Sequence, residues 1–176
     1  MEEELLVRAK KGDDDAFGQL VEMHLKTVEK FAFQIGVSPI HIEDVTQEVF
    51  LKVYRFLNKH TRGKFTTWLY TITMNVIRDF YRKEQQMKRK TVELQRYSLH
   101  QTYVDDHLDE DSKELHLMIQ KLDEKYRIPI ILHYFHGQNY QEIANVLSVS
   151  EGAIKTRILR AKQKLKAEYE KVGEQL

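Results

Sequence analysis

Apolar residues recur at the spacing of an α-helix along most of this chain, and this pattern limits the folds that the chain can adopt. Between residues 42 and 57, for example, Val45, Val49, Val53 and Phe56 fall on one helical face. Of the 176 residues only seven are Gly and two are Pro, so few positions would interrupt a helix. The sequence therefore predicts an all-α protein.

One long segment interrupts the helical pattern and divides the chain. Residues 91–112 have no steady apolar period, and they carry a cluster of five acidic residues: Asp105, Asp106, Asp109, Glu110 and Asp111. We interpret this segment as a flexible acidic linker. It joins two small predicted helical domains, at residues 1–90 and 113–176.

Helices are expected on both sides of this linker. Their predicted ranges are 2–11, 42–57, 65–90, 113–122, 126–136, 140–147 and 151–169. A further helix is expected after Gly12, with an apolar face from Ala16 to Val28 and with Asp15 as its candidate N-cap. Residues 36–44, "GVSPIHIED", contain Gly and Ser-Pro and are expected to form a break.

Composition argues against several classes of function. The chain has no Cys, and it has no P-loop, Gly-rich dinucleotide motif or HExxH sequence, so we expect no enzyme, catalytic residue, cofactor or small-molecule substrate. His133 and His136 are three residues apart but lack a third ligand, so no metal site is expected. No apolar run resembles a signal peptide or approaches the roughly 20 residues of a membrane span, which predicts a cytoplasmic protein.

Residues 139–165, "NYQEIANVLSVSEGAIKTRILRAKQKL", have the pattern of a helix-turn-helix. Asn139 and Glu142 are spaced as a capping box at the start of a short helix, and Ser150 is placed to cap the next one. Two helices joined by a turn of three or four residues are typical of this motif. Ser148 stands where many such turns have Gly, so a slightly different turn is expected.

The second helix of this motif has an inner and an outer face. Ile154, Ile158, Ala161 and Leu165 share the inner face. The outer face and its flanks hold Gly152, Lys155, Thr156, Arg157, Leu159, Arg160, Lys162, Gln163 and Lys164. A major-groove helix needs such a layout, because its tip meets base edges while flanking cations meet phosphates. Arg160 would bind a guanine and Leu159 a thymine methyl group; the alternative is a solvated basic face.

Two surfaces of the N-terminal half suggest further partners. On helix 42–57, a second apolar strip of Phe50, Leu51, Tyr54 and Leu57 lies beside polar residues, a pattern typical of a partner site: Asp44, Gln47 and Glu48. Helix 65–90 interleaves aromatic and basic residues, which suits unpaired bases and their backbone. These are Phe65, Trp68, Tyr70, Asn75, Arg78, Phe80, Tyr81, Arg82 and Lys83. For each single aromatic residue, a place in the core is the alternative.

Three segments in this order resemble the extracytoplasmic-function (ECF) sigma factors of bacterial RNA polymerase. They are "IEDVTQEVFLKVYRFL", "KFTTWLYTITMNVIRDFYRK" and "YQEIANVLSVSEGAIKTRILRAKQKL". The resemblance covers nearly the whole chain outside residues 91–112. It implies a region 2-like domain at 1–90 and a region 4-like domain at 113–176, with core RNA polymerase (its clamp and flap) and promoter DNA, duplex and melted, as partners.

The resemblance also implies roles for individual residues. The helix that grips the polymerase clamp corresponds to Asp44, Gln47, Glu48, Phe50, Leu51 and Tyr54. The surface that opens the minus-10 element corresponds to Lys64, Phe65, Thr66, Trp68, Asn75, Arg78 and Arg82. The reader of the minus-35 element corresponds to Gly152, Lys155, Thr156, Arg157, Leu159, Arg160, Gln163 and Lys164.

Two other hypotheses remain open at the level of sequence. A stand-alone helix-turn-helix regulator would bind duplex operators without polymerase. An interaction protein would use the second apolar strip of helix 42–57 to bind another helix. The latter is compatible with a sigma factor, because family members are commonly held inactive by anti-sigma factors, often membrane-bound, which makes such a factor a candidate partner.

Overall fold

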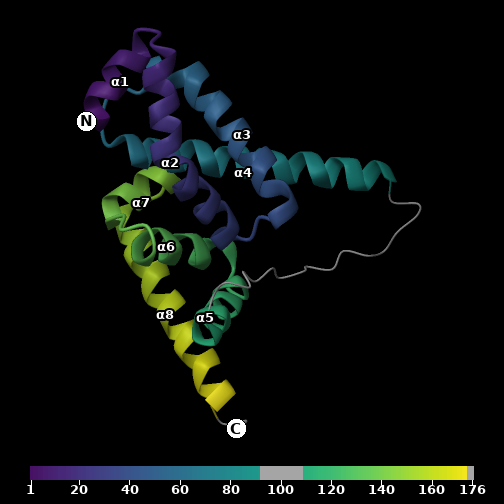
Figure 1. Ribbon diagram of the computed structural model, residues 1–176. Coiled ribbons are helices and arrows are strands. Elements are labelled where there is room, and N and C mark those ends of the chain that lie inside the picture. Colours follow the sequence, from purple (N-terminus) through teal and green to yellow (C-terminus); the bar gives the residue numbers. More distant parts are fainter. Residues whose placement is uncertain (92–108, 174–176) are drawn as a thin grey trace. The chain divides into compact units, whose positions relative to one another are not determined.

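The computed structural model describes residues 1–91 and 109–173, and every regular element in these ranges is a helix (Figure 1). The all-α prediction is confirmed. The helices are α1 (Glu2–Lys10), α2 (Asp14–Ile35), α3 (Pro39–Phe56), the short 3-10 helix η1 (Leu57–Lys59), α4 (Phe65–Thr91), α5 (Glu110–Gln120), α6 (Glu124–Tyr134), α7 (Tyr140–Leu147) and α8 (Glu151–Gly173).

The chain forms two compact units. The first holds α1–α4 apart from the segment Gln34–Ser38, and the second holds α5–α8 together with that segment. Each unit has its own apolar core, as expected for two separately folded domains.

In the first unit, the start of α2 differs from the expected one. The backbone N–H of Ala16 donates a hydrogen bond of 3.0 Å to the Asp13 carboxylate, so Asp13 caps the helix and Asp15 does not. Arg8 also pairs with Asp13 at 2.8 Å. The hydrogen bond from Ala16, and then the one from Arg8, lower the pKa of the Asp13 carboxyl. Asp13 therefore joins the end of α1 to the start of α2.

The predicted break at 36–44 is only partly correct. α3 begins at Pro39, inside this segment, because Pro fits the first position of a helix, where its missing N–H would have no partner. The buried residues of α3 include Val45, Val49 and Val53, the expected core face. α3 packs on α4, and apolar residues of α2 and α4 are buried in the same unit, among them Leu20, Val28, Phe31, Leu69 and Met74.

In the second unit, α5 begins within the segment predicted to be a linker. Asp109 is its N-cap, and its carboxylate accepts a hydrogen bond of 2.8 Å from the backbone N–H of Ser112. The last acidic residues of the predicted cluster thus belong to a helix start, where negative charge is favourable. Asp105 and Asp106 lie outside the described residues.

The predicted caps of the helix-turn-helix are confirmed. The Asn139 side chain accepts from the Glu142 backbone N–H at 2.9 Å, and the Glu142 carboxylate accepts from the Asn139 N–H at 2.8 Å. Ser150 Oγ accepts from the Ala153 N–H at 3.1 Å, at the start of α8. These bonds satisfy backbone donors that a helix start leaves without an intrahelical acceptor.

Ser148 ends α7 in the left-handed conformation, with φ 54° and ψ 46°. The turn is therefore the left-handed one that Gly favours, and the expectation of a different turn is wrong. A residue with a Cβ is strained in this conformation by about 1–2 kcal/mol. Ser148 is the one residue other than Gly with a positive φ among the described residues.

Ser148→Gly is expected to raise the free energy of unfolding of the second unit by about 0.5–1 kcal/mol. Relief of the left-handed strain outweighs the extra freedom that Gly gives the unfolded chain. Thermal and urea unfolding of the full chain, followed by helical circular dichroism, measures the change. Ser148→Ala keeps a Cβ and is the matched control. An equal gain from Ser148→Ala, or a loss with Ser148→Gly, contradicts the prediction.

Candidate nucleic-acid and polymerase interfaces

The outer face of α8 is exposed as the sequence predicts. Its inner face is buried, with Ile154 and Ala161 fully enclosed and Ile158 nearly so. Leu165 is half-buried. Of the residues predicted to contact the minus-35 element, Arg157 is half-buried and the others are exposed: Gly152, Lys155, Thr156, Leu159, Arg160, Gln163 and Lys164. The α6 and α7 helices pack on α8 and hold this orientation.

Leu159 is 57% exposed beside the cations of this face. Water does not favour an exposed apolar side chain, so contact with another apolar group would be stabilising. A thymine methyl group is one apolar group that could supply this contact. Lys155 pairs with Glu151 at 3.0 Å, one turn earlier on the helix. The basic charge of the face is thus partly balanced at its N-terminal end and is concentrated further along α8.

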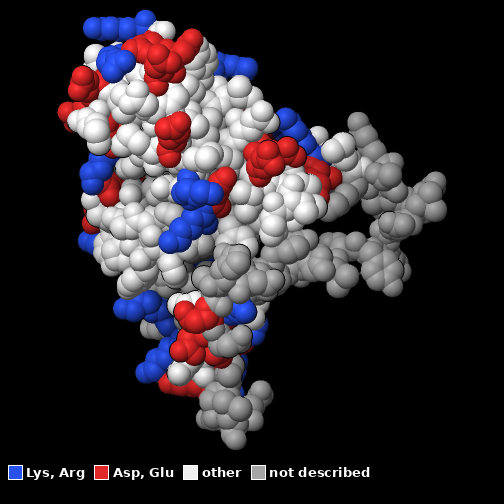
Figure 2. All heavy atoms as spheres, in the orientation of Figure 1, with Lys and Arg blue, Asp and Glu red and all other residues white. Residues whose placement is uncertain are grey.

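The face seen in Figure 2 shows no single field of charge. In the view of Figure 2, Lys and Arg stand along the edge of α8, with Asp and Glu beside them. This agrees with the formal net charge of +1. A contact with DNA therefore depends on where the basic side chains of particular helices point and not on total charge.

Tyr126 was not predicted to belong to this surface, but the structure places it there. It lies near the start of α6, and the ammonium group of Lys164 on α8 lies 5.5 Å from the centre of its ring. The sequence offered no signal for this contact, because the two residues lie on different helices. Only the packing of α6 on α8 brings them together.

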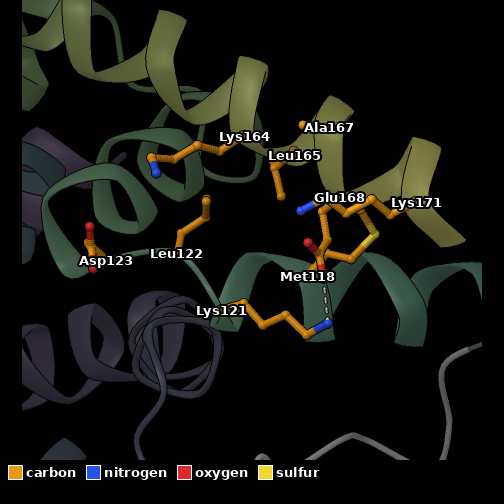
Figure 3. A pocket seen from close by; sticks show the side chains of 9 residues that line it. All are labelled: Met118, Lys121, Leu122, Asp123, Lys164, Leu165, Ala167, Glu168 and Lys171. Carbon is orange, nitrogen blue, oxygen red and sulfur yellow. Dashed lines mark hydrogen bonds and ion pairs between the residues drawn. The ribbon is translucent and has the colours of Figure 1, made fainter.

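A groove of about 360 Å³ runs between α5 and α8 (Figure 3). Met118, Leu122 and Leu165 line its apolar part. Lys121 and Glu168 form an ion pair of 2.8 Å across it, which Figure 3 shows as a dashed line. The groove belongs to the packing of these two helices, and Lys164 of the outer face of α8 also lines it.

On α3, the predicted polymerase-binding residues divide into two sets. Five are exposed: Asp44, Gln47, Glu48, Leu51 and Tyr54. Phe50 and Leu57 are 8% and 3% exposed, so half of the second apolar strip is core. The expectation that Phe50 faces a partner is not met in this structure, because other helices of the unit cover its ring.

Tyr54 is held in place on this surface. Its ring meets that of Phe17 edge-on at 4.9 Å, and its hydroxyl donates a hydrogen bond of 3.2 Å to Asp14. The same carboxylate raises the pKa of Tyr54, because it favours the protonated phenol. An apolar ring with a fixed hydroxyl is suited to a protein contact.

On α4, the predicted minus-10 residues also divide. Lys64, Asn75, Arg78 and Arg82 are exposed, and Thr66 and Trp68 are half-buried. Phe65 is 5% exposed, as is Tyr70 at 4%, so both rings belong to the core. For Phe65 and Tyr70, the structure therefore supports the alternative reading of the sequence, in which a single aromatic residue belongs to the core. Asp79 pairs with Arg82 at 2.8 Å and with Lys52 at 3.2 Å.

His60 supports Trp68 from below the surface. Its ring is 8% exposed and lies 5.2 Å from the ring of Trp68 and 5.9 Å from that of Phe65. Both ring nitrogens are buried without a hydrogen-bond partner. Burial, and then the nearby charge of Lys10, lower the pKa of His60. The neutral form is therefore the one that fits this site.

Neither a metal-ligand cluster nor a membrane-spanning helix is found among the described residues. In these ranges, no three His, Cys, Asp or Glu side chains are placed to hold a metal ion. His133 uses Nδ1 in a hydrogen bond of 2.9 Å with the Gln138 carbonyl. None of the helices among these residues is long and apolar enough to cross a membrane.

Comparison with known proteins identifies the family. Residues 20–87 match the family model Sigma-70 region 2, and residues 112–165 match Sigma-70, region 4. The chain is 33% identical over 173 residues to the ECF RNA polymerase sigma factor SigW of Bacillus subtilis (strain 168), covering 90% of this chain and 91% of that protein. This chain belongs to the ECF sigma factors of RNA polymerase. The resemblance inferred from its sequence is confirmed.

Other relatives of this sigma factor agree in length and fold. The RNA polymerase sigma factor NccH of Alcaligenes xylosoxydans xylosoxydans is 32% identical over 178 residues, covering 95% of this chain and 94% of that protein. Among solved structures, CnrH in complex with the cytosolic domain of CnrY matches with a TM-score of 0.70 and 28% identity, covering 94% of this chain and 95% of that one. Sigma factors are in general non-enzymatic transcription initiation factors.

The burial of neutral His60 predicts how stability depends on pH. As pH falls through the usual histidine range, the unfolded chain takes up a proton at His60 before the folded chain does, so the free energy of unfolding decreases. In His60→Phe, the part of this decrease in the free energy of unfolding that comes from protonation of His60 is expected to vanish. Unfolding followed by the fluorescence of Trp68, between about pH 7.5 and about pH 5.5, measures the difference.

Lys10→Met is the matched second variant, because it removes a charge that lowers the pKa of His60 and keeps the apolar stem. It should weaken the pH dependence without abolishing it. If wild type and His60→Phe lose stability in parallel over this range, His60 does not carry the effect.

Proposed function

We propose that this sigma factor binds core RNA polymerase, in the cytoplasm, and directs it to promoters through two DNA contacts. The domain at residues 1–90 binds polymerase and opens the minus-10 element. The linker at 91–112 connects it to the domain at 113–176, which binds the minus-35 element. Membership of the ECF sigma factors supports the overall activity, and the exposed outer face of α8 is the observation that carries the division of roles.

The proposed minus-35 contact follows from the layout of α8. With Ile154, Ile158 and Ala161 buried, Thr156, Leu159 and Arg160 point away from the unit, where a major groove can receive them. Arg160 would bind a guanine edge, and Lys155, Arg157 and Lys164 on the flanks would meet phosphates. Gly152 and Gln163 lie at the two ends of the same face.

The proposed polymerase contact uses the exposed part of α3. Asp44, Gln47 and Glu48 supply polar groups, while Leu51 and Tyr54 are each 55% exposed and supply apolar area. A mixed surface of this kind is typical of a protein interface with an apolar centre and a polar rim. Phe50 would support this surface from inside the core and not touch the clamp directly.

The proposed minus-10 contact uses α4 and the loop before it. Lys64, Arg78 and Arg82 are exposed cations for the backbone of a melted strand, and Trp68 and Thr66 lie half-exposed among them for unpaired bases. Asn75 on the same helix offers an amide for a base edge. Phe65 would hold Trp68 from within, since their ring centroids are 5.8 Å apart. Taking a base out of the stack costs a few kcal/mol, which such a surface offsets.

An inhibitory protein partner is part of the same proposal. CnrH, 28% identical to this chain, was solved in complex with the cytosolic domain of CnrY. We extend that kind of partner to this chain as an anti-sigma factor that holds it inactive, at the membrane where the factor itself is membrane-bound.

The test is a pull-down with bacterial core RNA polymerase, followed by run-off transcription on a fragmented genomic template. Core binding with new, discrete start sites supports the proposal and reveals the promoters. Binding of duplex DNA by the chain alone, with no binding of core polymerase, would instead establish a stand-alone regulator.

Point variants test the division of roles. Arg160→Ala is expected to weaken binding of holoenzyme to duplex promoter DNA by roughly 5- to 100-fold, the range expected for one bidentate base contact, with core binding unchanged. Gln47→Ala and Tyr54→Ala should weaken binding to core polymerase and leave recognition of the upstream duplex intact. Lys166→Ala, which removes a cation from α8 outside the proposed face, is the matched control. Loss of core binding with Arg160→Ala would show that the roles are assigned wrongly.

A further inference from the structure

A lysine of α1 reaches the start of the loop that leads into α4. The Lys10 ammonium donates a hydrogen bond of 2.5 Å to the backbone carbonyl of His60, 50 residues further along the chain. Lys10 is half-buried, and α1 packs against η1, the 3-10 helix that ends just before His60. A hydrogen bond from a charged donor is stronger than one between neutral groups. This bond therefore ties the first helix of the unit to His60.

His60 is the residue at which this loop and the ring of Trp68 meet. Its backbone N–H donates a hydrogen bond of 3.1 Å to the Leu57 carbonyl, and its buried ring lies 5.2 Å from that of Trp68. Residues 61–64 follow without regular structure, and each of them is exposed. The loop ends at Lys64, whose carbonyl accepts a hydrogen bond of 3.3 Å from the Trp68 N–H. Lys64 and Trp68 both belong to the proposed minus-10 contact.

The place of His60 depends on packing and on its backbone, because both ring nitrogens are buried without a hydrogen-bond partner. The bond to Leu57 spans three residues, whereas the bond from Lys10 comes from another helix. A partly buried carbonyl is costly to leave without a donor, so removal of the Lys10 ammonium would favour movement of His60 toward water. An exposed loop whose start is not fixed has more conformations to lose when a DNA strand orders it.

We propose that Lys10 is a positioning residue for the minus-10 contact: by holding the His60 carbonyl, it fixes the loop that carries Lys64 and the ring beneath Trp68. This rests on the proposed function, in which that loop and α4 bind the melted strand. Lys10 acts through His60 and is assigned no contact with a base. A purely structural role would make Lys10 matter for stability alone, whereas positioning makes it matter for strand binding by the folded protein.

Three variants separate positioning from charge and from stability. Lys10→Met keeps the apolar stem and removes the donor, and Lys10→Arg keeps a charged donor. Lys11→Met removes the same charge from the next residue, which is exposed, and is the matched control. Binding is measured well below the thermal midpoint of each variant, so a change in stability alone does not alter it.

The first measurement needs only the free protein. Trp68 is the one Trp of the sequence, so the fluorescence of the chain reports on its surroundings. At about pH 7.5 His60 is neutral. Under this condition Lys10→Met is expected to increase acrylamide quenching of Trp68 and to shift its emission to longer wavelength, because a less fixed His60 exposes the indole. Lys10→Arg should restore the wild-type quenching, and Lys11→Met should leave it unchanged.

The second measurement uses holoenzyme and promoter fragments recovered by run-off transcription, prepared with the minus-10 segment of the non-template strand unpaired. Lys10→Met is expected to weaken binding to these fragments by roughly 3- to 10-fold, the effect of leaving one or two side chains unfixed. Binding to core polymerase, and to a duplex that carries the minus-35 element alone, should stay unchanged. Lys10→Arg should regain most of the binding, and Lys11→Met should bind like wild type.

Unchanged binding of Lys10→Met to the unpaired fragments would overturn the proposal, and so would unchanged quenching of Trp68. An equal loss from Lys11→Met would overturn it in favour of a general effect of charge, and an equal loss from Lys10→Arg would show that the donor is not what matters. If wild type bound core polymerase and started transcription as expected, such results would count against the role of Lys10 alone. A wild type that did not bind core polymerase would overturn the proposed function and this role with it.

Discussion

The packing of one face of α8 against α6 and α7 is the interaction on which the second unit depends. Ile154 and Ala161 are fully buried in it, and Ile158 is nearly so. The helical period then leaves no choice for the residues between them, and Thr156, Leu159 and Arg160 must face outward. The core that stabilises the unit therefore also orients the surface that we assign to DNA.

The turn before α8 sets the angle at which that surface is presented. Asn139 and Glu142 satisfy each other's backbone at the start of α7, Ser150 caps α8, and Ser148 between them takes a left-handed conformation. Each cap contributes about 1 kcal/mol, a large share of the stability of a small domain. The strain at Ser148 shows that the geometry of the turn is kept at some cost in stability.

In the first unit the same helices supply both the core and the proposed partner surfaces. Phe50 and Phe65 are buried, while Tyr54 and Trp68 lie at the surface and contact other rings. His60 fits beneath Trp68 as a neutral ring with no hydrogen-bond partner at either nitrogen. Trp68 thus contacts two buried rings and Tyr54 a half-buried one, and such contacts restrict the motion of both side chains.

The sequence by itself determined the helices, the capping box and the outward face of α8, because these depend on hydrogen bonds between near neighbours and on a period of 3.6 residues. It could not choose between Asp13 and Asp15 as the cap of α2, since both are suitable residue types. The hydrogen bond from the Ala16 N–H to the Asp13 carboxylate shows that Asp13 is the cap. Only the tertiary structure decided that Phe50 and Phe65 are core, because burial depends on which other helices cover a face. The contact of the Tyr126 ring with Lys164 likewise exists only where α6 packs on α8.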